Sequence, residues 1–315
     1  MDRIPVILNV DTGIDDALAI TVAAASEIIE ILAVTTSFGN GTLEQTTENT
    51  LRIIELLELD VPVAAGADKP MMPQTRTKIL ASAAQGDDGL GGKSGLLPYP
   101  ARGVADVSAV ELMASEIQKS DKNVVIVSTC ALTNIAVLLL AHPELKKKID
   151  GIAFSGSAVY TGNVLPTVEA NLLADPEAAQ IVLRSGVKVL LCSMDATNGA
   201  YVTFEDREKF RLANNRVSAF FYETLKSYSD HYENLLLKEG SPLHDVVPVA
   251  WLIDPALVKT KAYYVEVDLN GYYTRGATVV DVQGVWNKPP NAAIAVEADR
   301  KKINELIFES LRKNK

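Results

Sequence analysis

The chain has 315 residues, of which 48% are hydrophobic, and its formal net charge is −10. This acidity argues against nucleic acid or an anionic membrane as a partner, and two distant cysteines exclude a disulfide framework. Neither a signal-peptide pattern nor a membrane-spanning apolar run is apparent, so we expect a soluble cytoplasmic protein.

The first predicted elements are a buried strand over residues 4–10 and a helix over 17–25. Three aspartates, Asp11, Asp15 and Asp16, crowd the turn between them. In an open α/β sheet, ligands bind in the crevice at such strand ends. An aspartate at a helix start is also a common cap, and this alternative accounts for one of the three, Asp15. Because like charges this close repel, a hard divalent cation with oxygen ligands explains all three better.

Strand and helix patterns alternate along the rest of the chain, which predicts βαβ units. We therefore expect one α/β domain over residues 1–315, Rossmann-like, with a mostly parallel central sheet flanked by helices. Asn270-Gly271, between apolar residues 262–269 and 272–282, predicts a C-terminal β-hairpin. The other strands are predicted at 30–36, 63–65, 123–127, 151–154, 187–192 and 291–296, and the helices at 43–59, 108–119, 204–239 and 299–313, with one more that Asp175 caps.

Candidate ligand-binding residues follow several of these elements. Asn40 lies between two glycines after the second strand, where a ligand contact and an ordinary turn explain it equally well. Residues 66–106 form a long loop, for which a lid and solvated disorder are the alternatives. Tyr228 and Tyr232 share a helix face and either flank a planar ring or belong to the core. His244 adjoins an aspartate at the head of an apolar helix, which favours a catalytic role.

Taken together, these stretches resemble the inosine-uridine-preferring nucleoside hydrolases, a family of calcium-dependent enzymes. Residues 9–16 resemble the family's Asp-x-Asp-Pro-Gly-x-Asp-Asp signature, and further blocks occur in family order over nearly the whole chain. These blocks are Phe38-Gly39-Asn40, Leu132-Thr133-Asn134-Ile135, Gly162-Asn163, Glu169-Ala170-Asn171, Asp175-Pro176-Glu177-Ala178-Ala179 and His244-Asp245.

The resemblance implies hydrolysis of the N-glycosidic bond of ribonucleosides, giving ribose and a free base. A water bound to Ca²⁺ would attack after losing a proton to Asp11, and His244 would help the base to leave. The implied metal ligands are Asp11, Asp16, Asp245 and the backbone carbonyl of Thr129. The implied ribose contacts are Asp15, Asn40, Asn163, Glu169 and Asn171, and the tyrosine pair adds Tyr228 and Tyr232 as candidate substrate contacts. We also expect a role in nucleoside salvage, a small-molecule ribonucleoside as partner, and a homodimer or homotetramer.

Five residues depart from the family pattern. Asn9 and Thr12 replace the first Asp and the Pro of the signature. Gln85 stands where some members have His in a loop over the base, Ala170 where Phe is common, and Ser155 where Met is frequent. Because the metal and ribose positions are intact, we expect preserved chemistry with a relaxed or shifted base preference.

Two other functions compete with this interpretation. Phosphatases of the haloacid dehalogenase type also carry Asp-x-Asp after their first strand, but their nucleophile position is Asn9 here, and an amide cannot attack phosphorus. A non-catalytic nucleoside- or sugar-binding protein would not need Asp11 and His244, which are both present.

Overall fold

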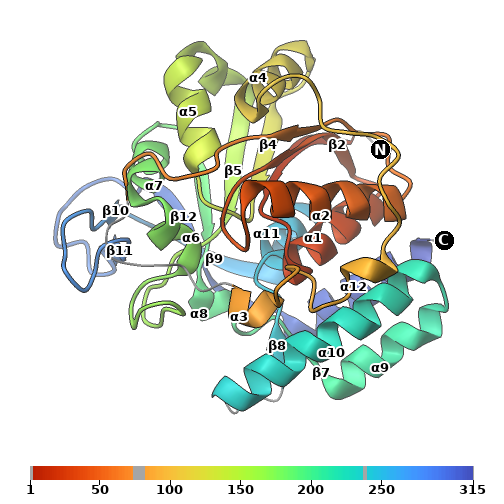
Figure 1. Cartoon of the computed structure of the whole chain (residues 1–315). Helices are drawn as coiled ribbons and strands as arrows, with labels where there is room; N and C mark the ends of the chain where they lie inside the picture. Colours follow the sequence, from red (N-terminus) through yellow and green to blue (C-terminus); the bar gives the residue numbers. More distant parts are fainter. Residues whose placement is uncertain (1–2, 74–81, 237–239, 315) are drawn as a thin grey trace.

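A central sheet of eight strands lies between two layers of helices (Figure 1). The computed structural model describes residues 3–73, 82–236 and 240–314. All neighbouring strands in this sheet are parallel except the edge strand β9, which is antiparallel to β12. In spatial order the strands are β3 (Val63–Ala65), β2 (Ile29–Thr36), β1 (Ile4–Val10), β4 (Val124–Ser128), β5 (Ile149–Ser155), β6 (Val189–Cys192), β12 (Ala292–Ala298) and β9 (Val258–Tyr263).

Helices cover both faces of the sheet. One layer contains α1 (Ile14–Ala25), α2 (Leu43–Leu56), α10 (Arg216–Leu236), α11 (Val246–Ile253) and α12 (Arg300–Lys313). The other contains α4 (Ala109–Lys119), α5 (Thr133–Ala141) and α7 (Pro176–Leu183). The shorter elements are α3 (Ser82–Gln85), α6 (Ala170–Ala174), α8 (Met194–Thr197), α9 (Phe204–Phe210), the 3₁₀ helices Ser94–Leu96, Pro143–Lys148, Arg211–Ala213 and Pro255–Leu257, and two ribbons, β7 (Tyr201–Thr203) with β8 (Gly240–Pro242) and β10 (Val265–Val267) with β11 (Thr278–Val280).

The sheet separates two hydrophobic cores. Alternate side chains of β1 point to opposite faces, so Val6 and Leu8 pack in the core on the α1 side and Ile7 in the core on the α5 side. A parallel sheet that is buried on both faces needs apolar residues at consecutive positions. This requirement explains the uninterrupted apolar run of the first strand.

Strand β1 lies at the point where the strand order reverses. From β1 the chain proceeds outward to β2 and β3, and then returns to β4 on the other side of β1. Asn9, near the end of β1, is in register with Thr35 of β2 and with Ser128 of β4. The loops that follow these three strands therefore meet around one crevice, where open α/β sheets bind ligands.

Most of the predicted elements are confirmed. The strands at 4–10 and 63–65 have the predicted bounds, and Asp175 caps α7 by accepting a hydrogen bond from the backbone N–H of Ala178. The helix predicted over 43–59 ends earlier, at Leu56. Within the described parts of the chain, no helix combines the length and apolarity that a membrane span requires.

The predicted C-terminal hairpin is wrong in its extent. Residues 258–263 join the central sheet as β9, and only the three-residue strands β10 and β11 pair as a ribbon. The carboxylate of Asp268 accepts hydrogen bonds from the backbone N–H groups of Asn270 and Gly271. These bonds hold the two residues in a wider loop in place of a two-residue turn.

Candidate active site

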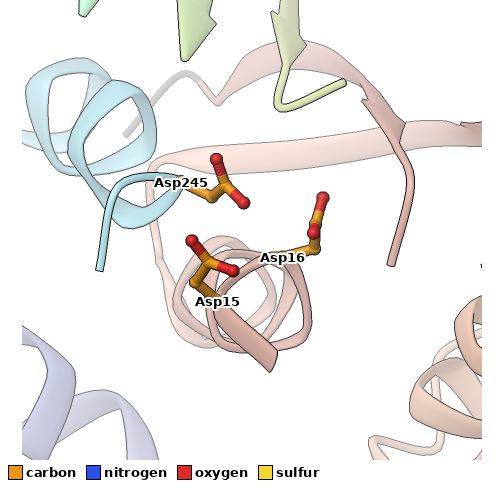
Figure 2. Close-up of side chains that lie close together, drawn as sticks. All are labelled: Asp15, Asp16 and Asp245. Atoms are coloured by element: carbon orange, nitrogen blue, oxygen red, sulfur yellow. The ribbon is translucent and has the colours of Figure 1, made fainter. Parts of the chain in front are cut away.

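Three buried carboxylates from distant parts of the chain meet at the crevice. Asp15 and Asp16 belong to the first turn of α1, and Asp245 immediately precedes α11. One oxygen from each carboxylate lies within 4.8 Å of the others, and the side chains face a common space (Figure 2). The strand–turn–helix of the N-terminal segment thus supplies two of the acids, and a segment 229 residues further on supplies the third.

This carboxylate cluster is electrostatically unfavourable by itself. Burial and the charge of Asp16 raise the pKa of Asp15 to about 6. Burial also raises the pKa of Asp16, and burial together with the charges of Asp15 and Asp16 raises the pKa of Asp245 well above its ordinary value. Among the described residues, no lysine or arginine pairs with these acids. Three oxygen donors that lack a positive partner suit a hard divalent cation.

Asp16 also caps the helix that carries it. Its carboxylate accepts hydrogen bonds from the backbone N–H of Gly13 at 3.0 Å and from the Thr129 hydroxyl at 2.5 Å. It also accepts one from the Asn40 side chain at 2.9 Å. The capping alternative weighed for Asp15 therefore applies to Asp16, because the carboxylate of Asp16, at the third helical position, satisfies the free N–H of Gly13.

Asp11 lies beside this cluster and is held by Asn40. Its Oδ2 accepts a hydrogen bond of 2.8 Å from the Asn40 backbone N–H, and its Oδ1 accepts one of 3.3 Å from the Asn40 side chain. A Cβ atom at Gly39 would collide with this carboxylate, so the loop can approach it only with glycine there. Burial, and then the charge of Asp16, raise the pKa of Asp11 well above its ordinary value.

The predicted contacts Glu169 and Asn171 lie at the start of α6 and reach the same crevice. The Asn171 amide donates to the backbone carbonyls of Thr129 at 2.8 Å and Ser155 at 2.9 Å, which ties together the loops after β4 and β5. Glu169 accepts hydrogen bonds from the backbone N–H groups of Asn171 and Leu172. Burial raises the pKa of this Glu169 carboxyl to about 7.

The remaining predicted residues differ in their surroundings. Asn163 is exposed, and its side chain accepts a hydrogen bond from the backbone N–H of Ala170, next to Glu169. His244 precedes Asp245, and its Nδ1 is 2.7 Å from the Thr197 hydroxyl. Tyr228 is 1% exposed and packs in the core on the α1 side, while the side chain of Tyr232 lies outside the described residues.

Sequence reasoning missed three contacts of the site. The Gln85 side chain hydrogen-bonds to Asp15, and the Ser155 side chain forms a hydrogen bond that lowers the pKa of Asp245. Both positions stand out in the sequence only as departures from the family pattern. The third, Thr197 beside His244, carries no signal in the sequence.

Asn9 is a buried connector and not a reacting group. Its amide nitrogen donates to Ser128 Oγ and Cys130 Sγ, each at 3.0 Å. Its oxygen accepts from Thr35 Oγ1 at 3.0 Å and from the Asn134 amide at 2.9 Å. Both ends of the amide are therefore engaged inside the protein.

Comparison with known proteins identifies the family. A family model described as inosine-uridine preferring nucleoside hydrolase matches residues 6–305. The pyrimidine-specific ribonucleoside hydrolase RihA of Escherichia coli is 41% identical over 311 residues, which cover 98% of each chain. Among solved structures, a purine-preferring ribonucleoside hydrolase from Gardnerella vaginalis has a TM-score of 0.90 at 32% identity, covering 98% of each chain. A plant nucleoside hydrolase has the same TM-score at 28% identity, covering 98% of this chain and 99% of its own. The chain belongs to the inosine-uridine preferring nucleoside hydrolase family and is a ribonucleoside hydrolase.

Proposed function

We propose that this hydrolase is calcium-dependent and acts on pyrimidine ribonucleosides, releasing ribose and the free base. The observation that carries the proposal is the buried cluster of Asp15, Asp16 and Asp245, which has oxygen donors and no basic partner among the described residues. Asp11 extends the same acidic crevice, and Glu169 adjoins Asn171, which bonds to the carbonyl of Thr129. A site with this charge favours a reaction in which the substrate becomes positive, as the ribosyl group does when an N-glycosidic bond breaks.

The residues that would hold the cation are Asp16 and Asp245, together with Asp11 and the backbone carbonyl of Thr129. When bound, Ca²⁺ would supply the positive charge that offsets the repulsion among the acids, and it would lower the pKa of a water bound to it. Asp15 is close enough to share the metal, but the family resemblance implies a ribose contact at this position, and we assign Asp15 that role.

The chain's own residues then account for each proton. Asp11 accepts the proton of the water whose oxygen forms a bond to C1′ of the ribose. The C1′–N bond breaks with its electron pair moving to the base, and His244 donates a proton to the base as it leaves. Glu169 and Asn171, at the start of α6, hold the ribose hydroxyls. Because Glu169 is buried, a sugar without the hydroxyl that it binds would lose a hydrogen bond that water replaces poorly there.

The preference for pyrimidines has separate support. The relative with 41% identity is described as pyrimidine-specific, while the purine-preferring structure is only 32% identical. Both ends of the Gln85 side chain bond to residues of the α1 N-terminus, so this position does not offer the base a histidine-like partner. The homo-oligomer and the cytoplasmic location remain predictions.

A nucleoside panel tests the proposal. Release of reducing sugar is measured from uridine, cytidine, inosine and adenosine, in calcium and after dialysis against a chelator. We expect kcat/KM to be highest for the pyrimidine nucleosides and turnover to disappear with the metal and return when Ca²⁺ is added. Turnover that persists in the chelator would refute the calcium dependence, and faster cleavage of inosine would refute the pyrimidine preference.

A further inference from the structure

Gln85 connects the loop after α3 to the first residues of α1. Its Nε2 donates a hydrogen bond of 3.0 Å to Oδ1 of Asp15, and its Oε1 accepts one of 2.8 Å from the backbone N–H of Ile14. The side chain is 5% exposed. Both ends of one amide therefore bind two consecutive residues at the N-terminus of a helix.

The surroundings admit this side chain only because a neighbour is small. A Cβ atom at Gly13 would lie 2.7 Å from Cδ of Gln85, closer than side-chain atoms approach. The two contacts also require an amide. A glutamate at this position would place a second carboxylate against Asp15, and a leucine would make neither bond.

The loop that carries Gln85 has anchors of its own. The Gln45 side chain donates to the carbonyl of Asp87 at 2.7 Å, and the Asn49 side chain donates to the carbonyl of Asp88 at 3.0 Å. The Asp88 carboxylate accepts hydrogen bonds from three backbone N–H groups of the loop, those of Leu90, Gly92 and Ser94. These bonds hold the loop without the help of Gln85. The bond from Gln85 to Asp15 is therefore not needed to fix the loop, and we look for its purpose at Asp15.

We propose that Gln85 is a positioning residue that fixes the Asp15 carboxylate for the ribose hydroxyl that it binds. The inference rests on the proposed role of Asp15 as a ribose contact. The amide donates to Oδ1 and so restrains the orientation of the Asp15 carboxylate, which faces the same space as Asp16 and Asp245 (Figure 2). Without Gln85, the Asp15 carboxylate would lose its amide donor within a crowded acidic cluster.

The test compares substrates that differ by one hydroxyl. Gln85→Leu, Gln85→Glu and the parent enzyme are assayed with uridine, 2′-deoxyuridine and 3′-deoxyuridine. A hydrogen bond to a charged group corresponds to about 10- to 100-fold, so we expect this loss in kcat/KM for uridine. For the deoxynucleoside that lacks the hydroxyl bound by Asp15, the loss should be below about threefold, because nothing is left for Asp15 to hold.

Gln45→Leu is the matched control, since it removes a glutamine that anchors the same loop without touching Asp15. It should change kcat/KM by less than about threefold for all three substrates. Equal losses on all three substrates in Gln85→Leu, or a shift in its half-saturating calcium concentration, would overturn the inference. Asp15→Asn shows which of the two roles fails in that case. If this variant also loses kcat/KM equally on all three substrates, the ribose role of Asp15 is wrong. If its loss is smaller on one deoxynucleoside, the ribose role of Asp15 stands and only the positioning role of Gln85 is wrong.

Discussion

The Glu169 carboxyl provides a quantitative test of the burial at this site. Its pKa is raised from an ordinary 4.5 to about 7, chiefly by burial. Between these two values the unfolded chain has lost the proton and the folded chain still holds it. The free energy of unfolding therefore falls as the pH rises. The stabilisation is complete below pH 4.5 and is lost as the pH passes through about 7.

The size of the effect follows from the same pair of values. Each pH unit corresponds to about 1.4 kcal/mol, so the change from 4.5 to about 7 is worth about 3 kcal/mol. Unfolding entropies of about 2 cal/mol/K per residue convert this energy into a Tm difference of about 5 °C for a chain of this length. Glu169→Gln cannot ionise, so the Tm of the variant relative to the parent should increase by this amount between pH 4.5 and pH 8.

The assay is a thermal melt of both proteins at intervals between pH 4.5 and pH 8. Saturating Ca²⁺ is included throughout, so that titration of the aspartate cluster contributes equally to both. Glu205→Gln, on the exposed side of α9, provides the baseline for losing one carboxyl. A Tm difference between Glu169→Gln and the parent that does not vary with pH would refute the reasoning, since the buried carboxyl would then be ionised over the whole range.

Three further predictions concern the metal, the general acid His244 and the general base Asp11. Ca²⁺ at a hundred times its Kd should raise the Tm of the parent by about 4 °C and should not raise that of Asp245→Asn, which calorimetry can check. His244→Ala should lower kcat for uridine by about a hundredfold or more but barely affect a 4-nitrophenyl riboside, whose leaving group needs no proton; equal losses would assign His244 to binding or folding. Asp11→Asn should lower kcat on both substrates by a similar factor at saturating calcium, and activity that survives would place the base elsewhere.

The sequence was informative where local chemistry decides the structure. Strand β1 was predicted with its observed bounds because a run of apolar residues buried on both faces has few other interpretations. The cap at Asp175 followed from the proline after it. The C-terminal hairpin formed with shorter strands and a wider loop than predicted, and in that loop the Asp268 side chain accepts from the N–H groups of Asn270 and Gly271.

The candidate site was predictable in its residues but not in its pairings. The family motifs selected Asp11, Asp15, Asp16 and Asp245, yet they could not indicate that the cluster would join Asp15 and not Asp11 to the other two. That grouping depends on side-chain orientations, which Asn40 and Gln85 set from other loops. Contacts across such sequence separations depend on the path of the folded chain and leave no local pattern.

The capping bonds of Asp16 have an evolutionary consequence. Its carboxylate accepts from the backbone N–H of Gly13, from the Thr129 hydroxyl and from the Asn40 amide, so replacing it would leave buried donors unsatisfied even if no reaction were under selection. Asp11 and His244 also have partners, Asn40 and the Thr197 hydroxyl, but neither caps a helix. A lineage that abandoned catalysis would therefore still be expected to keep Asp16 for its fold, so an intact Asp16 alone does not show that a relative is still an enzyme.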